Sequence, residues 1–123
     1  MRILLTGKNG QVGGELARSL STLGTVIAMG RDQLDLAKPE TLGSVIKKLQ
    51  PDIIVNAAAY TAVDKAESEP DLAMTVNGVA PGVIAQEAKS IGAGMIHYST
   101  DYVFDGTSSS PYNEEDSTSP LNV

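Results

Sequence analysis

The sequence has no cysteine and no long apolar run, and each absence excludes a class of protein. Without cysteine there is no disulfide framework, no thiolate metal site and no cysteine nucleophile. The apolar stretches are too short to cross a bilayer, and residues 1–7 are too short an apolar run for a secretory signal. We therefore expect no membrane partner and a cytoplasmic location.

Basic residues are also few, because 9 Lys and Arg stand against 15 Asp and Glu and give a net charge of -6. A nucleic-acid-binding surface needs a basic face, so we expect no nucleic-acid partner. His97 is the only histidine and falls in a predicted strand, where a structural role is favoured over a metal site or a catalytic base. With 41% apolar and 20% charged residues, the 123-residue chain has the composition of one ordinary globular domain.

Short apolar runs alternate with helical patterns along the chain. The runs predict buried strands at residues 2–6, 25–29, 52–56 and 94–98. Apolar residues at helical spacing predict helices over residues 11–23, 39–50 and 71–91. Gly78, Pro81 and Gly82 interrupt the last pattern, which predicts a kink or two helices there. This alternation indicates the α/β class, with a Rossmann-type doubly wound parallel sheet and right-handed crossovers.

The predicted sheet stops after about four strands, whereas a full doubly wound dinucleotide domain has six. We assign residues 1–105 to a partial NAD(P)-binding Rossmann domain. Residues 106–123 are rich in Ser, Thr, Pro and acids, and we expect a polar loop or tail that leads toward a missing catalytic segment. The chain is therefore expected to be part of a longer protein.

The most informative stretch is Gly-Lys-Asn-Gly-Gln-Val-Gly at residues 7–13, between the first predicted strand and the first predicted helix. Gly7 permits a tight turn, Gly10 lets the backbone approach a pyrophosphate, and Gly13 lets the helix pack closely on the strand. The free N–H groups and positive dipole end of the helix then face the phosphates. A tight turn without a ligand is the alternative, but the strand–turn–helix context favours dinucleotide binding.

The residues after the second predicted strand bear on the choice between NADPH and NADH. An acid at this place usually holds the ribose hydroxyls of NAD. Here Gly30 leaves space and Arg31 offers a planar fork for a 2′-phosphate, which favours NADPH. Asp32 lies one position late for the NAD role and keeps NADH as the alternative, while a solvated surface charge is the other interpretation of Arg31.

Three motifs together resemble the dTDP-4-dehydrorhamnose reductase family, a branch of the extended short-chain dehydrogenases/reductases. They are the glycine turn, Val-Asn-Ala-Ala-Ala-Tyr-Thr-Ala-Val-Asp-Lys-Ala-Glu at 55–67 and Ser-Thr-Asp-Tyr-Val-Phe-Asp-Gly at 99–106. The tail from Pro111 to Val123 fits too, so the resemblance covers the whole chain. It implies NADPH-dependent reduction of the 4-keto group of dTDP-4-dehydro-6-deoxy-L-mannose to dTDP-L-rhamnose, with the dTDP-sugar as partner.

The glycine turn, the residues after the second strand and the positions carried over from the family together give the predicted site residues. Those on the cofactor are Gly7, Gly10, Gln11, Val12, Gly13, Arg31, Asp35, Leu36, Ala58, Ala59, Tyr60, Thr61 and Tyr98. Thr100 would hold the substrate oxygen, with Asp101 beside it as the second catalytic position. Two assignments have alternatives from the residues themselves: Asp35 also suits a helix cap ahead of Pro39, and the bare alanines also suit close strand–helix packing.

The family's catalytic Tyr belongs to a Tyr-x-x-x-Lys motif that directly follows the Pro-Leu-Asn-Val stretch found here at residues 120–123. This sequence contains no Tyr-x-x-x-Lys, so we expect the 123-residue chain to be inactive by itself. Some members of the family hold Mg²⁺ at a dimer contact near the position of Glu15. Whether this protein forms a homodimer is a question that the sequence leaves open. One carboxylate does not make a magnesium cage, so we predict no metal site.

Two other functions remain as alternatives. The first is a non-catalytic NADP-binding subunit like the regulatory subunit of methionine adenosyltransferase, which also resembles this family. The second and weaker is a nucleotide-sugar epimerase or dehydratase. Dehydratases carry Thr-Asp-Glu after the fourth strand, whereas here Thr100 and Asp101 are followed by Tyr102.

Overall fold

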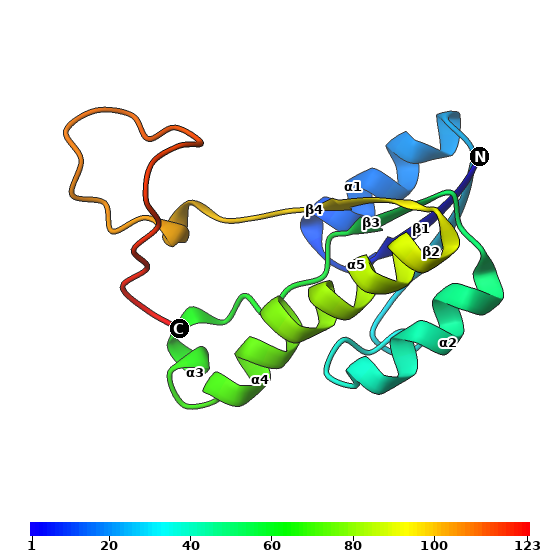
Figure 1. Ribbon diagram of the computed structural model, residues 1–123, viewed down its shortest axis with the longest axis horizontal. Coiled ribbons are helices and arrows are strands. Elements are labelled where there is room, and N and C mark those ends of the chain that lie inside the picture. The colour runs from blue at the N-terminus through cyan, green and yellow to red at the C-terminus, as the bar shows by residue number, and fades with distance from the viewer.

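The centre of the protein is a four-stranded parallel sheet in the order β2-β1-β3-β4 (Figure 1). The computed structural model describes residues 1–123. The strands are β1 (Arg2–Thr6), β2 (Thr25–Met29), β3 (Ile53–Asn56) and β4 (Gly94–His97). Each strand agrees with its predicted run to within one residue. The α/β class and the Rossmann-type parallel sheet are thus confirmed.

Helices cover both faces of the sheet (Figure 1). One face carries α1 (Gln11–Ser19), which continues into the 3₁₀ turn η1 (Leu20–Thr22). The other carries α2 (Pro39–Leu49) and α5 (Ala80–Ile91). Pro39 suits the start of α2 because its fixed φ fits the first helical turn, and Gln50 ends the helix in a left-handed conformation with φ 48°.

Side chains of β1 alternate between two apolar clusters, as the pleat of a strand requires. Ile3 and Leu5 pack with Val55 on the α1 face. Leu4 points to the opposite face and joins a larger cluster between the sheet, α2 and α5. The other buried members of that cluster are Leu34, Leu36, Leu42, Ile46, Ile54, Ala80, Ile84 and Ala88. A strand buried on both sides explains why β1 is a continuous apolar run in the sequence.

The predicted interruption of the third helix is a π-helical turn. The chain runs through α4 (Pro70–Met74), the π turn η2 (Thr75–Val79) and α5 without leaving the helical path. Pro81 has no N–H to donate to the carbonyl of Asn77 four residues earlier, which favours a wider turn at this place. The kink or break that the sequence predicts is therefore accommodated as one widened turn.

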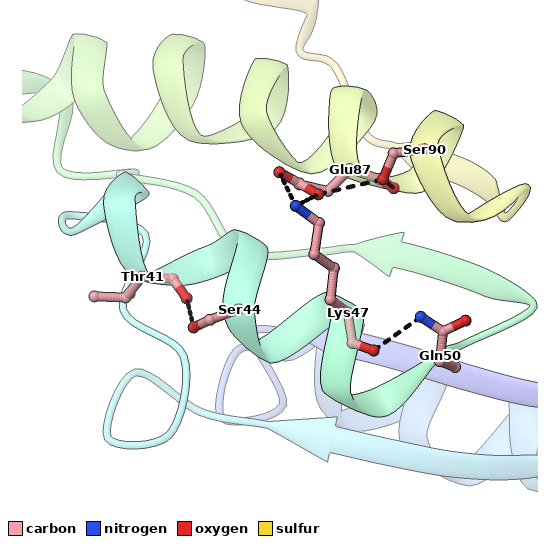
Figure 2. Close-up of polar contacts among 6 residues, drawn as sticks. All are labelled: Thr41, Ser44, Lys47, Gln50, Glu87 and Ser90. Carbon is pink, nitrogen blue, oxygen red and sulfur yellow. Dashed lines mark hydrogen bonds and ion pairs between the residues drawn. The ribbon is translucent and has the colours of Figure 1, made fainter.

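Polar contacts join the outer faces of α2 and α5 (Figure 2). Lys47 Nζ lies 3.1 Å from Glu87 Oε2, and Ser90 Oγ donates to the same oxygen at 3.3 Å. The Lys47 side chain is 59% exposed, so the ion pair contributes at most about 1 kcal/mol. The apolar cluster beneath is therefore the main force that holds the two helices together.

After β4 the chain forms one 3₁₀ turn, η3 (Asp101–Val103), and then no helix or strand. It folds back on itself through a stack of the Phe104 and Tyr112 rings, whose centroids are 4.2 Å apart. Its end lies beside α3 (Val63–Ala66), where the Val123 N–H donates to Glu67 Oε1 at 3.1 Å (Figure 1). No helix is long and apolar enough to cross a membrane.

Gly13→Ala should destabilise the protein, because a Cβ at Gly13 would lie 2.0 Å from the carbonyl oxygen of Gly7. Relief requires α1 to move away from β1, and we expect a loss of about 3 kcal/mol in the free energy of unfolding. Gly14→Ala is the matched control, since its Cβ meets only Lys8 O at 3.6 Å and alanine favours the helix by roughly 0.5–1 kcal/mol. Urea denaturation measures both, and equal effects would contradict the close-packing role of Gly13.

Candidate functional site

A cleft of about 740 Å³ lies at the carboxyl ends of β1, β2 and β3. The strand order reverses at β1, since β2 lies on one side of it and β3 on the other. Open α/β sheets bind ligands outside the strand ends at such a switch point. Of the residues that the sequence predicts for the cofactor, the cleft is lined by Gly7, Gly10, Gln11, Val12, Arg31, Asp35, Leu36, Ala58, Ala59, Tyr60 and Thr61.

At the floor of the cleft, the backbone of the glycine turn lies directly against the backbone of the segment after β3. Gly7 has φ +76°, and a Cβ there would lie 2.8 Å from atoms of both Ala57 and Ala58. Gly13 does not line the cleft but lies beneath the turn, against Gly7. The glycines therefore bring the end of β1, the start of α1 and the segment after β3 closer together than side chains would permit.

The N-terminus of α1 opens at the cleft. Gly10 is the N-cap residue and has no side chain to cap the helix. The first N–H groups of a helix have no partner within it, and the helix dipole makes this end positive. Gln11 and Val12 form the first turn and line the cleft, with Val12 51% exposed. This arrangement can bind a phosphate group without any charged side chain.

A row of polar side chains crosses the sheet where the strands end. Thr6, Asn56 and His97 occupy paired positions on β1, β3 and β4. The Thr6 hydroxyl donates to Asn56 Oδ1 at 2.5 Å, and Asn56 Nδ2 lies 3.0 Å from His97 Nδ1. The Ala58 N–H also donates to Asn56 Oδ1, at 3.3 Å. This row fixes the start of residues 57–61, the segment that forms one wall of the cleft.

Asn77 holds the same wall further along. Its Oδ1 accepts from the Tyr60 N–H at 2.8 Å and its Nδ2 donates to the Tyr60 carbonyl at 3.0 Å. Asn77 lies in the π turn η2, and turns of this kind occur at functional sites. Sequence reasoning missed this residue, because a pairing over seventeen positions leaves no local signal.

The Tyr60 side chain belongs to a charged network at the rim. Its hydroxyl donates to Glu69 Oε2 at 2.6 Å, and Lys65 Nζ lies 3.3 Å from Glu69 Oε1. The hydrogen bond to Glu69 raises the pKa of Tyr60, and the bonds from Tyr60 and Lys65 lower the pKa of Glu69. Tyr60 is therefore neutral and Glu69 ionised around neutral pH, and the tyrosine ring has a fixed place beside the cleft.

Arg31 and Asp35 form an ion pair on the opposite side of the cleft, with Arg31 Nε 3.4 Å from Asp35 Oδ1. The Arg31 side chain is 78% exposed at the edge of the cleft. Asp35 Oδ1 accepts from the Ala37 N–H at 3.0 Å, whereas the N-cap of α2 is Lys38. The alternative interpretation of Asp35 as the cap of α2 is thus wrong, because its carboxylate closes a turn before the helix.

The remaining predicted residues lie apart from the cleft lining. Tyr98 is exposed, and Thr100 Oγ1 accepts from the Tyr102 N–H at 3.2 Å as the N-cap of η3. Asp101 lines a second cavity of about 620 Å³. The network of Asp105 with Thr107 and Tyr112 lies beside it and lowers the pKa of Asp105 through hydrogen bonds, those from Thr107 first. Glu15 forms an ion pair with Arg18 on the surface of α1.

The sequence did not single out the apolar side of the cleft. Leu72 of α4 and Val76 of η2 line it, together with Leu34. Leu72 and Val76 are four positions apart on one helical face, a pattern that equally predicts core. Apolar residues beside a polar, bare floor suit a ligand with a flat apolar part and charged phosphates.

The parallel sheet, the glycine turn and the cleft at the switch point define a Rossmann-type nucleotide-binding unit. The whole chain, residues 1–123, matches the family described as RmlD substrate binding domain. The chain belongs to this family, and the resemblance to the N-terminal part of dTDP-4-dehydrorhamnose reductases is confirmed.

Relatives in this family agree in sequence and in structure. The dTDP-4-dehydrorhamnose reductase of Burkholderia thailandensis is 59% identical over 100% of this chain and 41% of its own length. A crystal structure of the reductase from Clostridium acetobutylicum has a TM-score of 0.95 at 38% identity, over 99% of this chain and 44% of that one. The structure of the Bacillus anthracis reductase in complex with NADP has a TM-score of 0.91 at 34% identity, over 98% of this chain and 44% of that one. The chain thus spans less than half the length of these relatives.

Asn77→Ala should free the Tyr60 backbone, because both hydrogen bonds to it come from the Asn77 side chain. We expect the Tyr60 amide proton to exchange at least tenfold faster, the loss of about 1.4 kcal/mol of local protection. Thr75→Ala is the control, since its hydroxyl bonds within the helix to Asp71 O and not to the wall. NMR-detected hydrogen exchange measures both, and unchanged exchange at Tyr60 in the Asn77 variant would contradict the proposed anchoring.

Proposed function

We propose that the protein carrying this chain reduces the 4-keto group of dTDP-4-dehydro-6-deoxy-L-mannose to dTDP-L-rhamnose with NADPH, and that this chain supplies the cofactor-binding part. The observation that carries the proposal is the cleft at the switch point, with its bare backbone floor and open helix N-terminus. The names of the relatives, one of them solved with NADP, support the same function.

The residues around the cleft fit a dinucleotide. The pyrophosphate would lie against Gly10, Gln11 and Val12, where a side chain at position 10 would narrow the approach. The adenosine would lie between the β2 end and Leu36, with Arg31 in reach of a 2′-phosphate. The second ribose would follow the wall that Asn77 holds, including Tyr60.

When bound, the nicotinamide supplies the hydride that the carbonyl carbon receives. The role of this chain is to bind and orient, and the carried-over assignments place Thr100 on the substrate oxygen with Asp101 beside it. The proton for that oxygen would come from the Tyr of a Tyr-x-x-x-Lys motif, which these 123 residues do not contain. Binding and proton transfer are thus assigned to different parts of the whole protein.

The test of the proposal compares the 123-residue chain with the longer protein that contains it. Both should bind NADP⁺, measured by calorimetry, because the cleft lies within residues 1–123. Only the longer protein should oxidise NADPH when the dTDP-4-keto sugar is added, followed at 340 nm. Ketone reduction by the 123-residue chain would overturn the assignment of proton transfer to a later segment, and lack of NADP⁺ binding by both would overturn the proposed function.

Arg31→Ala should weaken NADPH binding about tenfold, because a charge-assisted contact to the 2′-phosphate is lost. NADH has no such phosphate, so its dissociation constant should change less than twofold. Arg18→Ala is the control, since Arg18 lies on the exposed side of α1 and pairs with Glu15. Equal losses for NADPH and NADH in the Arg31 variant would exclude the 2′-phosphate role.

A further inference from the structure

We propose that Glu67 is a positioning residue for the reduction, because its carboxylate holds the tail of this chain against α3 and so places the residues that follow Val123. The tail segment 119–123 is held at two points, and neither of its partners lines the cofactor cleft. The proposal deepens the proposed function and rests on it, since proton transfer is assigned there to a segment later than Val123.

The first point of attachment is η3. The Ser119 N–H donates to the carbonyl of Val103, the last residue of η3, at 2.8 Å. The loop between these two residues is closed on itself, because the rings of Phe104 and Tyr112 stack with their centroids 4.2 Å apart. The tail therefore returns to the same turn that carries Asp101.

The second point is the turn of residues 67–69 between α3 and α4. Glu67 Oε1 accepts from the Val123 N–H at 3.1 Å. Glu67 takes part in none of the ion pairs of the structure, so no cation competes with the tail for its carboxylate. A backbone N–H on an ionised carboxylate is a charge-assisted hydrogen bond, which is stronger than a bond between neutral groups.

Apolar packing does not hold this part of the tail. Leu121 is 81% exposed and Val123 is 55% exposed. A cavity of about 620 Å³ lies between the tail, η3 and α3, lined among others by Leu121 and Val63. The hydrogen bond to Glu67 is therefore the contact that keeps the end of the tail on α3.

The same turn also holds the cofactor wall, through Glu69. Glu69 Oε2 accepts from the Tyr60 hydroxyl at 2.6 Å, and Tyr60 lines the cleft. Lys65 pairs with Glu69, which leaves Glu67 to the tail. Two carboxylates of one short turn thus fix Tyr60 and Val123 relative to each other. A misplacement of about 1 Å at a reacting group costs about 100-fold in rate, so the start of the segment that supplies the proton has to be held in this way.

The experiment uses the full-length protein with NADPH and the dTDP-4-keto sugar. Glu67→Ala removes the acceptor, so kcat should fall roughly 10- to 100-fold. The dissociation constant for NADP⁺ should stay within twofold of the wild type, because Glu67 does not line the cleft. Glu67→Gln keeps an oxygen acceptor and should retain most of kcat, whereas Glu67→Met keeps only the stem and should behave like Glu67→Ala. Glu114→Ala is the matched control, since Glu114 is an exposed acid of the same tail and is in none of the ion pairs.

Two further readouts separate positioning from a merely structural role. The solvent deuterium isotope effect on kcat should rise in Glu67→Ala, because misplacement slows proton transfer. Hydrogen exchange of the peptide that contains residues 119–123 should become about tenfold faster in Glu67→Ala and stay unchanged in Glu67→Gln.

The outcomes distinguish the two proposals. Wild-type protein that does not reduce the keto sugar would overturn the proposed function itself. An active wild type would overturn only the role of Glu67 if kcat were unchanged in Glu67→Ala, or if kcat and NADP⁺ affinity fell equally. A loss in Glu67→Gln as large as that in Glu67→Ala would do the same, because the hydrogen bond would then not be what matters.

Discussion

The direct contact between the start of α1 and the turn before it is the constraint on which the rest of the structure depends. At Gly13 the helix lies so close to Gly7 that no Cβ fits between them. Because α1 is held at this distance, its axis and its open N-terminus are both fixed relative to β1. The same approach brings α1 onto Ile3, Leu5 and Val55, so one contact determines a face of the core and one end of the cleft.

The wall of the cleft formed by residues 57–61 is held by other contacts. Gly7 meets the backbone of Ala57 and Ala58, and beyond them Asn77 holds Tyr60 by both of its backbone groups. The amide of Asn77 acts here as a substitute for a neighbouring strand, since it offers one acceptor and one donor at the right separation. Both walls are thus fixed through their backbone, whereas the side chain of Arg31, near the end of β2, is exposed at the rim.

The sequence was sufficient for the strands, the parallel sheet and the glycine turn, because these depend on short apolar runs and on residues within one turn. It also indicated that the helix after Pro70 is irregular, but not that the irregularity is a π turn. The contacts of Asn77 with Tyr60 and of Glu67 with Val123 join residues 17 and 56 positions apart. Such pairs depend on how loops meet after the sheet has formed, and no periodicity records them.

The polar row from Thr6 through Asn56 to His97 has a consequence for how the sheet assembles. The Asn56 amide is 1% exposed and has partners on both neighbouring strands only in the observed alignment. If β3 slipped by a single residue, its side chains would exchange faces and the amide would be buried without those partners. Each unsatisfied group would cost about 1–3 kcal/mol. Apolar strands such as Ile53–Asn56 slide past one another at little cost in contact area, so this one amide makes misaligned sheets unfavourable during folding.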